Sequence, residues 1–336
     1  MKKVGKVVGY LLAVVATALA AGIIYLQYAF PNVDAAPRLT IDKSPALVKR
    51  GEYLANHVAV CIDCHSTRDW SRLTAPPMAG TFGKGGDKFD HSLGFPGTFY
   101  ARNITSDKET GIGAWTDGEI YRAMTSGVSR NGEPLFPLMP YNSYRKMSRE
   151  DAYAIIAYIR TLQPIRNKVP KSDPDFPMNL ILRTMPARIP IVSPEPLLTD
   201  SVSLGKYLVT VAGCAECHTP QDKGSPVKDK MLAGGTEFSF PNGAILRSAN
   251  LTPDKKTGIG SWTEDAFVAR FKQYATPGGT PKVNPNEFNS LMPWSMYGGM
   301  KEGDLRAIYK YLHSLKPQNN KVEKYTPGQA SEAASS

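Results

Sequence analysis

Two short stretches decide how this chain is built: Cys61-Ile62-Asp63-Cys64-His65 and Cys214-Ala215-Glu216-Cys217-His218. Each has the pattern C-x-x-C-H, in which two thiols three residues apart can form thioether bonds to the two vinyl groups of a haem. The histidine that follows then lies beneath the iron. The two stretches use all four cysteines of the chain. They predict two covalently bound haem c groups, with thioether bonds to Cys61, Cys64, Cys214 and Cys217.

A C-x-x-C pair is also typical of a redox-active dithiol or of half a zinc site. A zinc site needs further ligands, but outside the two motifs the chain offers only His57, His91 and His313, and no further cysteine. A redox dithiol leaves the repeated histidine unexplained. The sequence therefore favours haem attachment, and we expect ordinary surface or core positions for the three remaining histidines.

The N-terminal segment has the composition of a membrane-spanning helix. Lysines at positions 2, 3 and 6 precede an apolar run of 24 residues from Val7 to Phe30. As a helix this run is about 36 Å long, which exceeds the ~30 Å hydrocarbon core of a bilayer. We expect an uncleaved anchor. The alternative is a cleaved signal peptide, with which Val33-Asp34-Ala35 is compatible, although signal peptides have shorter apolar regions.

The charges around this segment predict its orientation. Lysines on the N-terminal side place that end in the cytoplasm and the rest of the chain outside it. Haem is joined to cysteine in such an exported, oxidising compartment, so we expect a bacterial inner-membrane protein with periplasmic globular domains. The formal net charge of +10 suits a redox partner with an acidic face, or anionic lipid. Nucleic acid is not an expected partner, because the basic residues are scattered through an exported chain.

The two halves of the chain repeat one plan, which indicates a tandem duplication. His65 and His218 lie 153 residues apart, and so do Met139 and Met292. Between these points the halves match at an offset of 147, because six residues are lost before the repeated tryptophan and regained after it. The matching segments are residues 103–105 with 250–252, 110–113 with 257–260, and Trp115 with Trp262.

Capping signals predict three helices in each half. In the first half they begin near Ser44-Pro45, Thr116 and Ser148, and the glycine- and proline-rich segments between them predict loops. The expected fold class is therefore all-α. The expected organisation is a membrane anchor over residues 1–30, a tether over 31–43, haem domains over 44–163 and 201–317, a proline-rich linker over 164–200 and a disordered tail over 318–336.

The axial ligands of the two irons can be predicted from the repeat. His65 and His218 each supply one nitrogen, and methionine sulfur is the usual partner in cytochromes c, where it raises the reduction potential. Most methionines only fill gaps in cores. Met139 and Met292, however, both lie 78 residues after the first motif cysteine, both occur in Leu-Met-Pro-aromatic, and both precede the last predicted helix. We predict that they bind iron; the rivals are Met124, Met147, Met296 and Met300.

Further candidate haem neighbours are two repeated pairs, Trp115 with Trp262 and Asn103 with Asn250, and two arginines, Arg102 and Arg247. The tryptophans either pack on a haem edge or donate an N–H to a propionate, or they are plain core aromatics. The asparagines either donate to propionates or shape a turn. The arginines either pair with propionates, since guanidinium matches carboxylate, or are solvated.

Each half resembles the cytochrome c domains in the haem-bearing subunits of membrane-bound alcohol, gluconate and related periplasmic dehydrogenases. The shared pattern is G-x-Y-L before C-x-x-C-H, then N-I-T, T-G-I-G-x-W-T, M-P and a closing amphipathic helix, and it covers residues 44–315. The resemblance implies two tandem all-helical cytochrome c domains, with axial roles for His65, Met139, His218 and Met292. Those subunits usually carry three haem domains, whereas this chain has two motifs.

These features predict electron transfer rather than enzymatic catalysis. The expected donor is a periplasmic dehydrogenase or quinol-oxidising complex, and the expected acceptor is a soluble cytochrome or terminal oxidase. One alternative is a dihaem peroxidase, which needs a haem that can open a coordination position. Another is a thiosulfate-oxidising dihaem enzyme, which needs a spare cysteine ligand that this chain lacks. A third is a fixed haem subunit of a larger respiratory complex.

Overall fold

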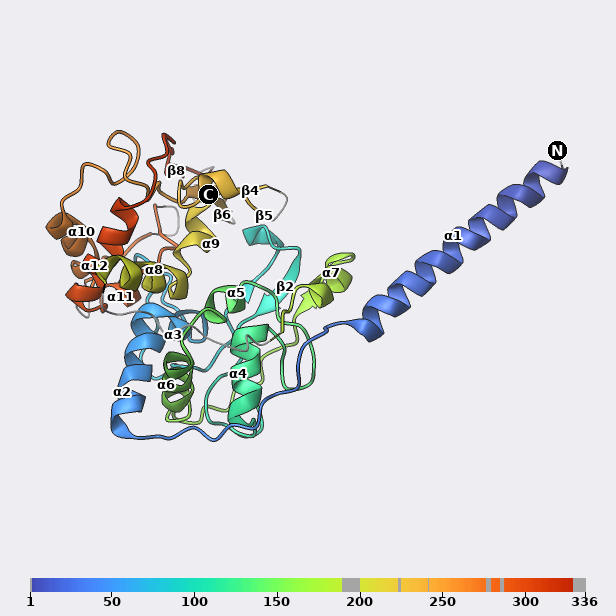
Figure 1. The fold of residues 1–336 in the computed structure, drawn as a ribbon, viewed down its shortest axis with the longest axis horizontal. Coiled ribbons are helices and arrows are strands. Elements are labelled where there is room, and N and C mark those ends of the chain that lie inside the picture. Colours follow the sequence, from blue (N-terminus) through green and yellow to red (C-terminus); the bar gives the residue numbers. More distant parts are fainter. Residues whose placement is uncertain are drawn as a thin grey trace, which may run out of the picture.

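A long N-terminal helix, α1 (Lys2–Ala29), projects from a body that contains the remaining elements (Figure 1). The computed structural model describes residues 2–188, 200–222, 225–240, 242–275, 279–284 and 287–328. Residues Lys3–Ala29 are long and apolar enough to cross a membrane, and none of their most apolar window is buried against the body. This agrees with the expected anchor and equally with its signal-peptide alternative.

The body has two units, and the first is built around a packed pair of helices. Helix α2 (Pro45–Tyr53) continues as a π-helical turn (Leu54–Val58) and packs against α6 (Arg149–Ile159). The two helices approach closely at Gly51, where a Cβ would lie 1.8 Å from the Ala154 carbonyl oxygen. The other helices of this unit are α3 (Cys61–Cys64), α4 (Asp117–Ser126) and α5 (Tyr141–Tyr144). The capping box predicted at Thr116 and Glu119 forms at the start of α4.

The second unit has the corresponding α-helices in the same order. Helix α8 (Ser201–Val211) packs against α12 (Glu302–His313), and a Cβ on Gly205 would lie 1.9 Å from the Ala307 carbonyl oxygen. Helices α9 (Cys214–His218), α10 (Glu264–Lys272) and α11 (Trp294–Tyr297) correspond to α3, α4 and α5. A single cluster of buried apolar side chains runs through both units.

The all-α expectation is incomplete, because each unit also contains a small antiparallel sheet. In the first unit the strand order is β1 (Lys88–Phe89), β2 (Gly97–Tyr100) and β3 (Asp173–Pro174). In the second it is β6 (Glu237–Ser239), β7 (Ile245–Arg247) and β8 (Tyr325–Thr326), and β4 (Gln221–Asp222) pairs with β5 (Ser225–Pro226). Strands of two to four residues are too short for an alternating pattern to be visible in the sequence. Single 3-10 turns occur at His91–Leu93 and Lys228–Lys230.

After its last long helix, each unit ends in a segment that returns to its own sheet. The predicted linker from residue 164 packs on the first unit at its start, since β3 pairs with β2. The disordered tail predicted from residue 318 is wrong at its start, since β8 pairs with β7. Side-chain hydrogen bonds rather than apolar periodicity hold these segments, as described below. The rest of the predicted linker and tail, residues 189–199 and 329–336, lies outside the described residues.

The segment between α1 and α2 lies along the first unit. The Ile41 amide donates to Asp117 Oδ2 at 3.0 Å, and the Ile41 side chain is buried. At Gly118, in the first turn of α4, a Cβ would lie 1.7 Å from the Pro37 carbonyl oxygen. The predicted tether is therefore packed against α4 in its second half.

The two units pack against each other through equivalent surfaces. The Tyr53 hydroxyl donates to Asp304 Oδ2 at 2.5 Å, and the Tyr207 hydroxyl donates to Asp151 Oδ2 at 2.7 Å. Each tyrosine hydroxyl also accepts a hydrogen bond of 3.1 Å from the backbone amide that lies three residues before its aspartate partner. Each contact joins the same positions with the units exchanged, so the interface has approximate two-fold symmetry. Burial raises the pKa of both hydroxyls, which therefore donate at neutral pH.

Further contacts join the motif regions across this interface. The Ser143 hydroxyl in α5 donates to Oε1 of Glu216, inside the second motif, at 2.8 Å. His57 Nδ1 lies 2.9 Å from the Met296 carbonyl oxygen. The loop at residues 71–74 bonds to residues 281, 283 and 289 of the second unit. The loop that precedes Met292 is thus held by the first unit.

Candidate functional site

Each Cys-x-x-Cys-His block forms a short helical turn that begins after a left-handed residue. Val60 precedes the first block with φ 48°, and Gly213 precedes the second with φ 65°. This conformation ends the preceding helix and redirects the chain. The motif turns, α3 and α9, therefore leave the long helices at equivalent points.

The two motif histidines have matching environments. His65 Nδ1 lies 2.6 Å from the Arg102 carbonyl oxygen, and His218 Nδ1 lies 2.7 Å from that of Ala249. A carbonyl can only accept, so Nδ1 carries the hydrogen and Nε2 keeps a free lone pair. Burial lowers the pKa of both imidazoles, which favours the neutral form. An oriented, neutral imidazole is what an axial metal ligand requires.

Two glycines that sequence reasoning missed bring these carbonyl groups to the histidines. The Gly85 amide donates to the His65 carbonyl at 2.9 Å, and the Gly234 amide donates to that of His218 at 2.7 Å. Both glycines are left-handed, with φ of 70° and 74°. A Cβ would lie 2.5 Å from the Arg102 carbonyl carbon in the first unit and 2.4 Å from that of Ala249 in the second. The signal was the repeated Gly-Gly pair at 85–86 and 234–235.

No disulfide joins the four cysteines; three are partly buried and Cys217 is exposed. Burial raises the pKa of Cys61 and Cys214 to about 12, so both are protonated at neutral pH. A redox-active dithiol needs the opposite, a lowered thiol pKa. Among the described residues, no group of three or more His, Cys, Asp or Glu side chains could hold a metal ion. The dithiol and zinc alternatives therefore gain no support.

Met139 and Met292 occupy matching loops. Each is partly buried at the edge of the apolar cluster, and each carbonyl accepts from the amide two residues later at 2.7 Å. The prolines that follow have nearly the same conformation, with φ −79° and ψ 56° in the first unit and φ −78° and ψ 64° in the second. The rivals are all buried in the core, the ordinary role of methionine: Met124, Met147, Met296 and Met300.

Two buried tyrosines, also missed at the sequence level, connect the methionine loops to the motifs. The Tyr144 hydroxyl donates to the Ala59 carbonyl at 2.7 Å, and the Tyr297 hydroxyl donates to that of Ala212 at 2.8 Å. Each acceptor lies two residues before a motif, and each tyrosine lies five residues after the methionine. Each bond thus draws the methionine loop towards the motif turn within one unit. That repeated spacing was a signal in the sequence.

The repeated asparagines use their amide groups within the protein. Asn103 Oδ1 accepts from the Thr105 amide at 2.9 Å, and its Nδ2 donates to the Ile165 carbonyl at 2.8 Å. Asn250 makes the same two bonds, to Thr252 at 2.9 Å and to the Gln318 carbonyl at 2.8 Å. These bonds favour the turn-shaping alternative. They also hold the segments after the last helix, which both begin Pro-x-x-Asn-Lys-Val, at 164–169 and 317–322.

The two candidate arginines and the two repeated tryptophans lie in different surroundings. Arg102 donates to the Pro170 carbonyl at 2.5 Å, and Arg247 pairs with Glu237 at 2.7 Å. Both arginines thus hold strands or chain ends of their own unit. Trp115 is partly buried against the apolar cluster, whereas Trp262 is exposed.

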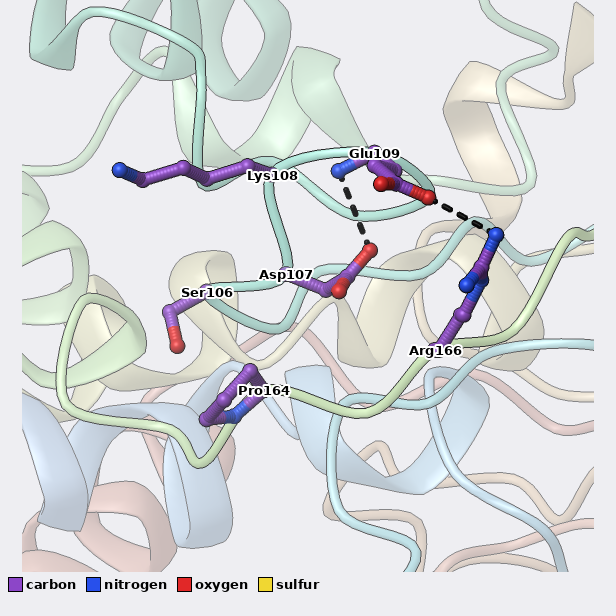
Figure 2. A pocket seen from close by; sticks show the side chains of 6 residues that line it. All are labelled: Ser106, Asp107, Lys108, Glu109, Pro164 and Arg166. Carbon is purple, nitrogen blue, oxygen red and sulfur yellow. Dashed lines mark hydrogen bonds and ion pairs between the residues drawn. The ribbon is translucent and has the colours of Figure 1, made fainter.

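A surface hollow lies beside the loop that Asn103 begins (Figure 2). Glu109 and Arg166 form an ion pair of 3.0 Å at its edge, and Asp107 Oδ1 accepts from the Glu109 amide at 3.2 Å. The Glu109 and Arg166 side chains are 69% and 78% exposed, and such pairs stabilise a fold by at most about 1 kcal/mol. The hollow is thus a feature of the loop surface and brings no motif residue together.

The chain is similar in sequence to known cytochrome c proteins. The family model "Cytochrome c" matches residues 202–316. The cytochrome c subunit of a quinone-dependent alcohol dehydrogenase from Gluconobacter oxydans is 33% identical over 293 residues, which are 82% of this chain and 56% of that subunit. The gluconate 2-dehydrogenase cytochrome c subunit of Pantoea cypripedii is 31% identical over 80% of this chain and 60% of its own length.

A relative of more similar length is the diheme cytochrome c-type protein of Cereibacter sphaeroides. It is 31% identical over 258 residues, which are 75% of this chain and 80% of that protein. The chain therefore spans only about 56–60% of those two dehydrogenase subunits but most of the diheme protein.

Proposed function

The chain belongs to the cytochrome c family, and from that premise we propose that it is a membrane-anchored electron carrier with two covalently bound haem c groups. One observation carries the proposal: two Cys-x-x-Cys-His turns whose histidines are each held by a backbone carbonyl at 2.6 and 2.7 Å, with Nε2 free. When bound, each haem supplies a reversible one-electron iron couple.

The residues present fit two such groups, one in each of two tandem cytochrome c domains. In the first domain we assign the thioether bonds to Cys61 and Cys64 and the axial positions to His65 and Met139. In the second, Cys214, Cys217, His218 and Met292 have the same roles. The support is geometric: the carbonyl that orients each histidine, the tyrosine that draws in each methionine loop, and the matching proline conformations occur in both units.

With a histidine and a methionine as protein ligands, each iron would have no position for a substrate, which agrees with an electron-transfer role. Methionine sulfur favours the reduced iron relative to a second histidine and so raises the potential. The hydrogen bond from Nδ1 keeps each imidazole in one tautomer and one orientation. A dihaem peroxidase needs one haem with an open position, and the matching conformations of the two methionine loops argue against such a difference between the units.

Internal electron transfer between the units is part of the proposal. The contact between Ser143 and Glu216 places α5 of the first unit against the motif of the second, and reciprocal Tyr–Asp bonds lock the same interface. The two motif regions are thus held by direct contacts. We infer that an electron entering at one haem passes to the other across this interface.

The partners follow from the relatives and from charge. Two relatives are cytochrome c subunits of an alcohol dehydrogenase and of a gluconate 2-dehydrogenase, so we propose a periplasmic dehydrogenase as the donor. The acceptor would be a downstream cytochrome or terminal oxidase. With α1 as the anchor, the body would lie on the periplasmic side of a bacterial inner membrane, and a formal net charge of +10 favours acidic partner surfaces.

The test is spectroscopic and redox analysis of the full-length holoprotein extracted in mild detergent. We expect two haems per chain, low-spin six-coordinate spectra, and a methionine-to-iron charge-transfer band in the oxidised state. A five-coordinate or bis-histidine haem at rest would overturn the ligand assignment. Subunits that remain bound after extraction would identify the donor, and turnover of peroxide or thiosulfate would favour the enzymatic alternatives.

A further inference from the structure

A short helix, α7 (Met178–Thr184), contacts the end of α1 at the point where α1 meets the body (Figure 1). Arg183 makes this contact. Its Nη2 donates to the carbonyl groups of Gln27 at 2.7 Å and Phe30 at 2.6 Å, and its Nε donates to that of Leu26 at 3.2 Å. The last carbonyls of a helix have no partner within the helix, and a cation there is favourable. Arg183 therefore caps α1 and holds α7 beside it.

This contact sets the depth of α7 relative to a membrane. The apolar run of α1 ends at Phe30, and its helical length slightly exceeds the hydrocarbon thickness, so its last turns reach the interface. Tyr25 and Tyr28, which are 64% and 87% exposed, stand in these turns, and tyrosine is enriched at membrane–water boundaries. Because Arg183 bonds to residues 26, 27 and 30, α7 lies at the same level.

The outer side of the α7 region is apolar. Phe176 is 75% exposed and Ile181 is 44% exposed, whereas Leu182 is buried. Both exposed apolar side chains belong to the segment that contacts the end of α1. The nearest acid, Asp175, is paired with His91 at 2.7 Å, and the exposed basic side chains of Lys171 and Arg188 flank the segment, which suits anionic headgroups.

We propose that residues 176–184 are a second membrane contact, in which Phe176 and Ile181 enter the boundary between headgroups and acyl chains. This rests on the proposed anchor. A lipid bilayer is favoured over a protein partner because Arg183 holds the segment at the end of the apolar helix α1. Helix α1 and residues 176–184 would then contact the membrane at the same depth. Together they would set the orientation of the body, and of both motif regions, relative to the bilayer.

Photo-crosslinking of the full-length holoprotein in phosphatidylethanolamine–phosphatidylglycerol nanodiscs tests this. A photoreactive p-benzoylphenylalanine replaces Phe176, with Tyr25 in α1 as the reference position and Phe288, a 44% exposed aromatic of the second unit, as the control. We expect lipid adducts from positions 25 and 176 and none from position 288. Adding Arg183→Gln should lower the adduct yield at position 176 severalfold and leave that at position 25 unchanged, whereas Arg166→Gln, at a 78% exposed arginine outside the proposed contact, should change neither.

Lipid adducts at position 25 without any at position 176 would overturn the proposal, as would adducts at position 176 with a co-purified protein instead of lipid. Equal adduct yields at positions 176 and 288 would mean nonspecific contact and would overturn it too. No adduct at position 25 would overturn the anchor and this proposal with it. The haem spectrum of the same samples reports the electron-transfer assignment separately, so its failure is distinguishable.

Discussion

The residue before the motif differs between the two units while its backbone does not. Val60 and Gly213 are both left-handed, with φ of 48° and 65°. Glycine adopts this conformation freely, whereas valine has a branched Cβ and is strained there. Hence the surrounding framework, and not the local residue preference, imposes the turn in the first unit.

The charges at the motifs differ as well. In the first unit Asp63 is buried, with Arg68 Nη1 at 3.6 Å, and Arg68 Nη2 lies 2.7 Å from Asp87 Oδ2. In the second, the equivalent of Asp63 is the exposed Glu216, which accepts from Ser143 across the interface, and Gln221 replaces Arg68. One framework therefore places a buried ion cluster beside one proposed haem and an interface contact beside the other.

The largest expected effect tests whether the two proposed irons are equivalent. His65→Ala and His218→Ala each remove one axial nitrogen, so each variant should lose about half of the six-coordinate haem signal. Electron exchange between the units should be lost in both. Absorption and magnetic circular dichroism spectra measure this, with His91→Ala as the control. A variant that keeps both low-spin signals would contradict the assignment.

Gly85→Ala and Gly234→Ala test the supports of the histidines. Each adds a Cβ about 2.5 Å from a carbonyl carbon at a left-handed position, and overpacking plus backbone strain should lower the free energy of unfolding by about 2–4 kcal/mol. Guanidinium unfolding followed by haem absorbance measures the loss. Gly80→Ala, also left-handed but with open space around it, isolates the backbone strain. Equal losses at Gly80 and Gly85 would show that crowding contributes nothing.

The buried ion cluster predicts a pH dependence confined to the first unit. Burial, partly offset by Arg68, raises the pKa of Asp63 to about 6, above the ~3.9 of an unfolded aspartate. Its contribution to stability is therefore full below about pH 4 and is lost as the pH rises through about 6. Asp63→Asn should remove its share of this slope, up to about 2 kcal/mol, from unfolding measured between pH 4 and 7, and the share of Asp87, whose pKa burial also raises, should remain. The matched change Glu216→Gln should leave the slope in place.

The interface tyrosines should show unequal effects despite their symmetry. Tyr53→Phe leaves Asp304 without its hydroxyl donor, and we expect a loss of about 2 kcal/mol in the free energy of unfolding. Tyr207→Phe should cost about 1 kcal/mol, because Arg50 still donates twice to Asp151 at 2.9 Å. Unfolding of the holoprotein gives both values, and the double variant tests additivity. Equal costs would mean that Arg50 does not compensate.

The smallest expected effects have opposite signs. Val60→Gly relieves strain and should stabilise the first unit by about 1 kcal/mol, whereas Gly213→Ala should destabilise the second by about 1 kcal/mol. A Cβ at Gly213 would have one neighbour, Glu216, at an ordinary van der Waals distance of 3.6 Å. The second change therefore measures the cost of the left-handed backbone without crowding. Thermal unfolding of the two variants measures both. A destabilised Val60→Gly protein would show that the Val60 side chain matters more than its φ.

Much of the site was visible in the sequence because its signals are local or periodic. The pentapeptides, the Leu-Met-Pro-aromatic loops and the capping residues Thr116 and Ser148 each act within a few positions. The supports of the site were missed, because Gly85 reaches across to Arg102 and Tyr144 reaches 85 residues back to Ala59. In the sequence, only the recurrence of these residues at the same spacing in both units indicated a function.

The sequence by itself determined two cysteine–histidine motifs, a shared plan for each unit and an apolar N-terminal helix, because covalent spacing and helical periodicity express these directly. Only the tertiary structure decided that the units pair through Tyr53 and Tyr207, that the chain after Pro164 and Pro317 returns to a sheet, and that Arg183 caps α1. These features rest on hydrogen bonds between residues about 50 to 250 positions apart, whose pairing depends on how the helices pack.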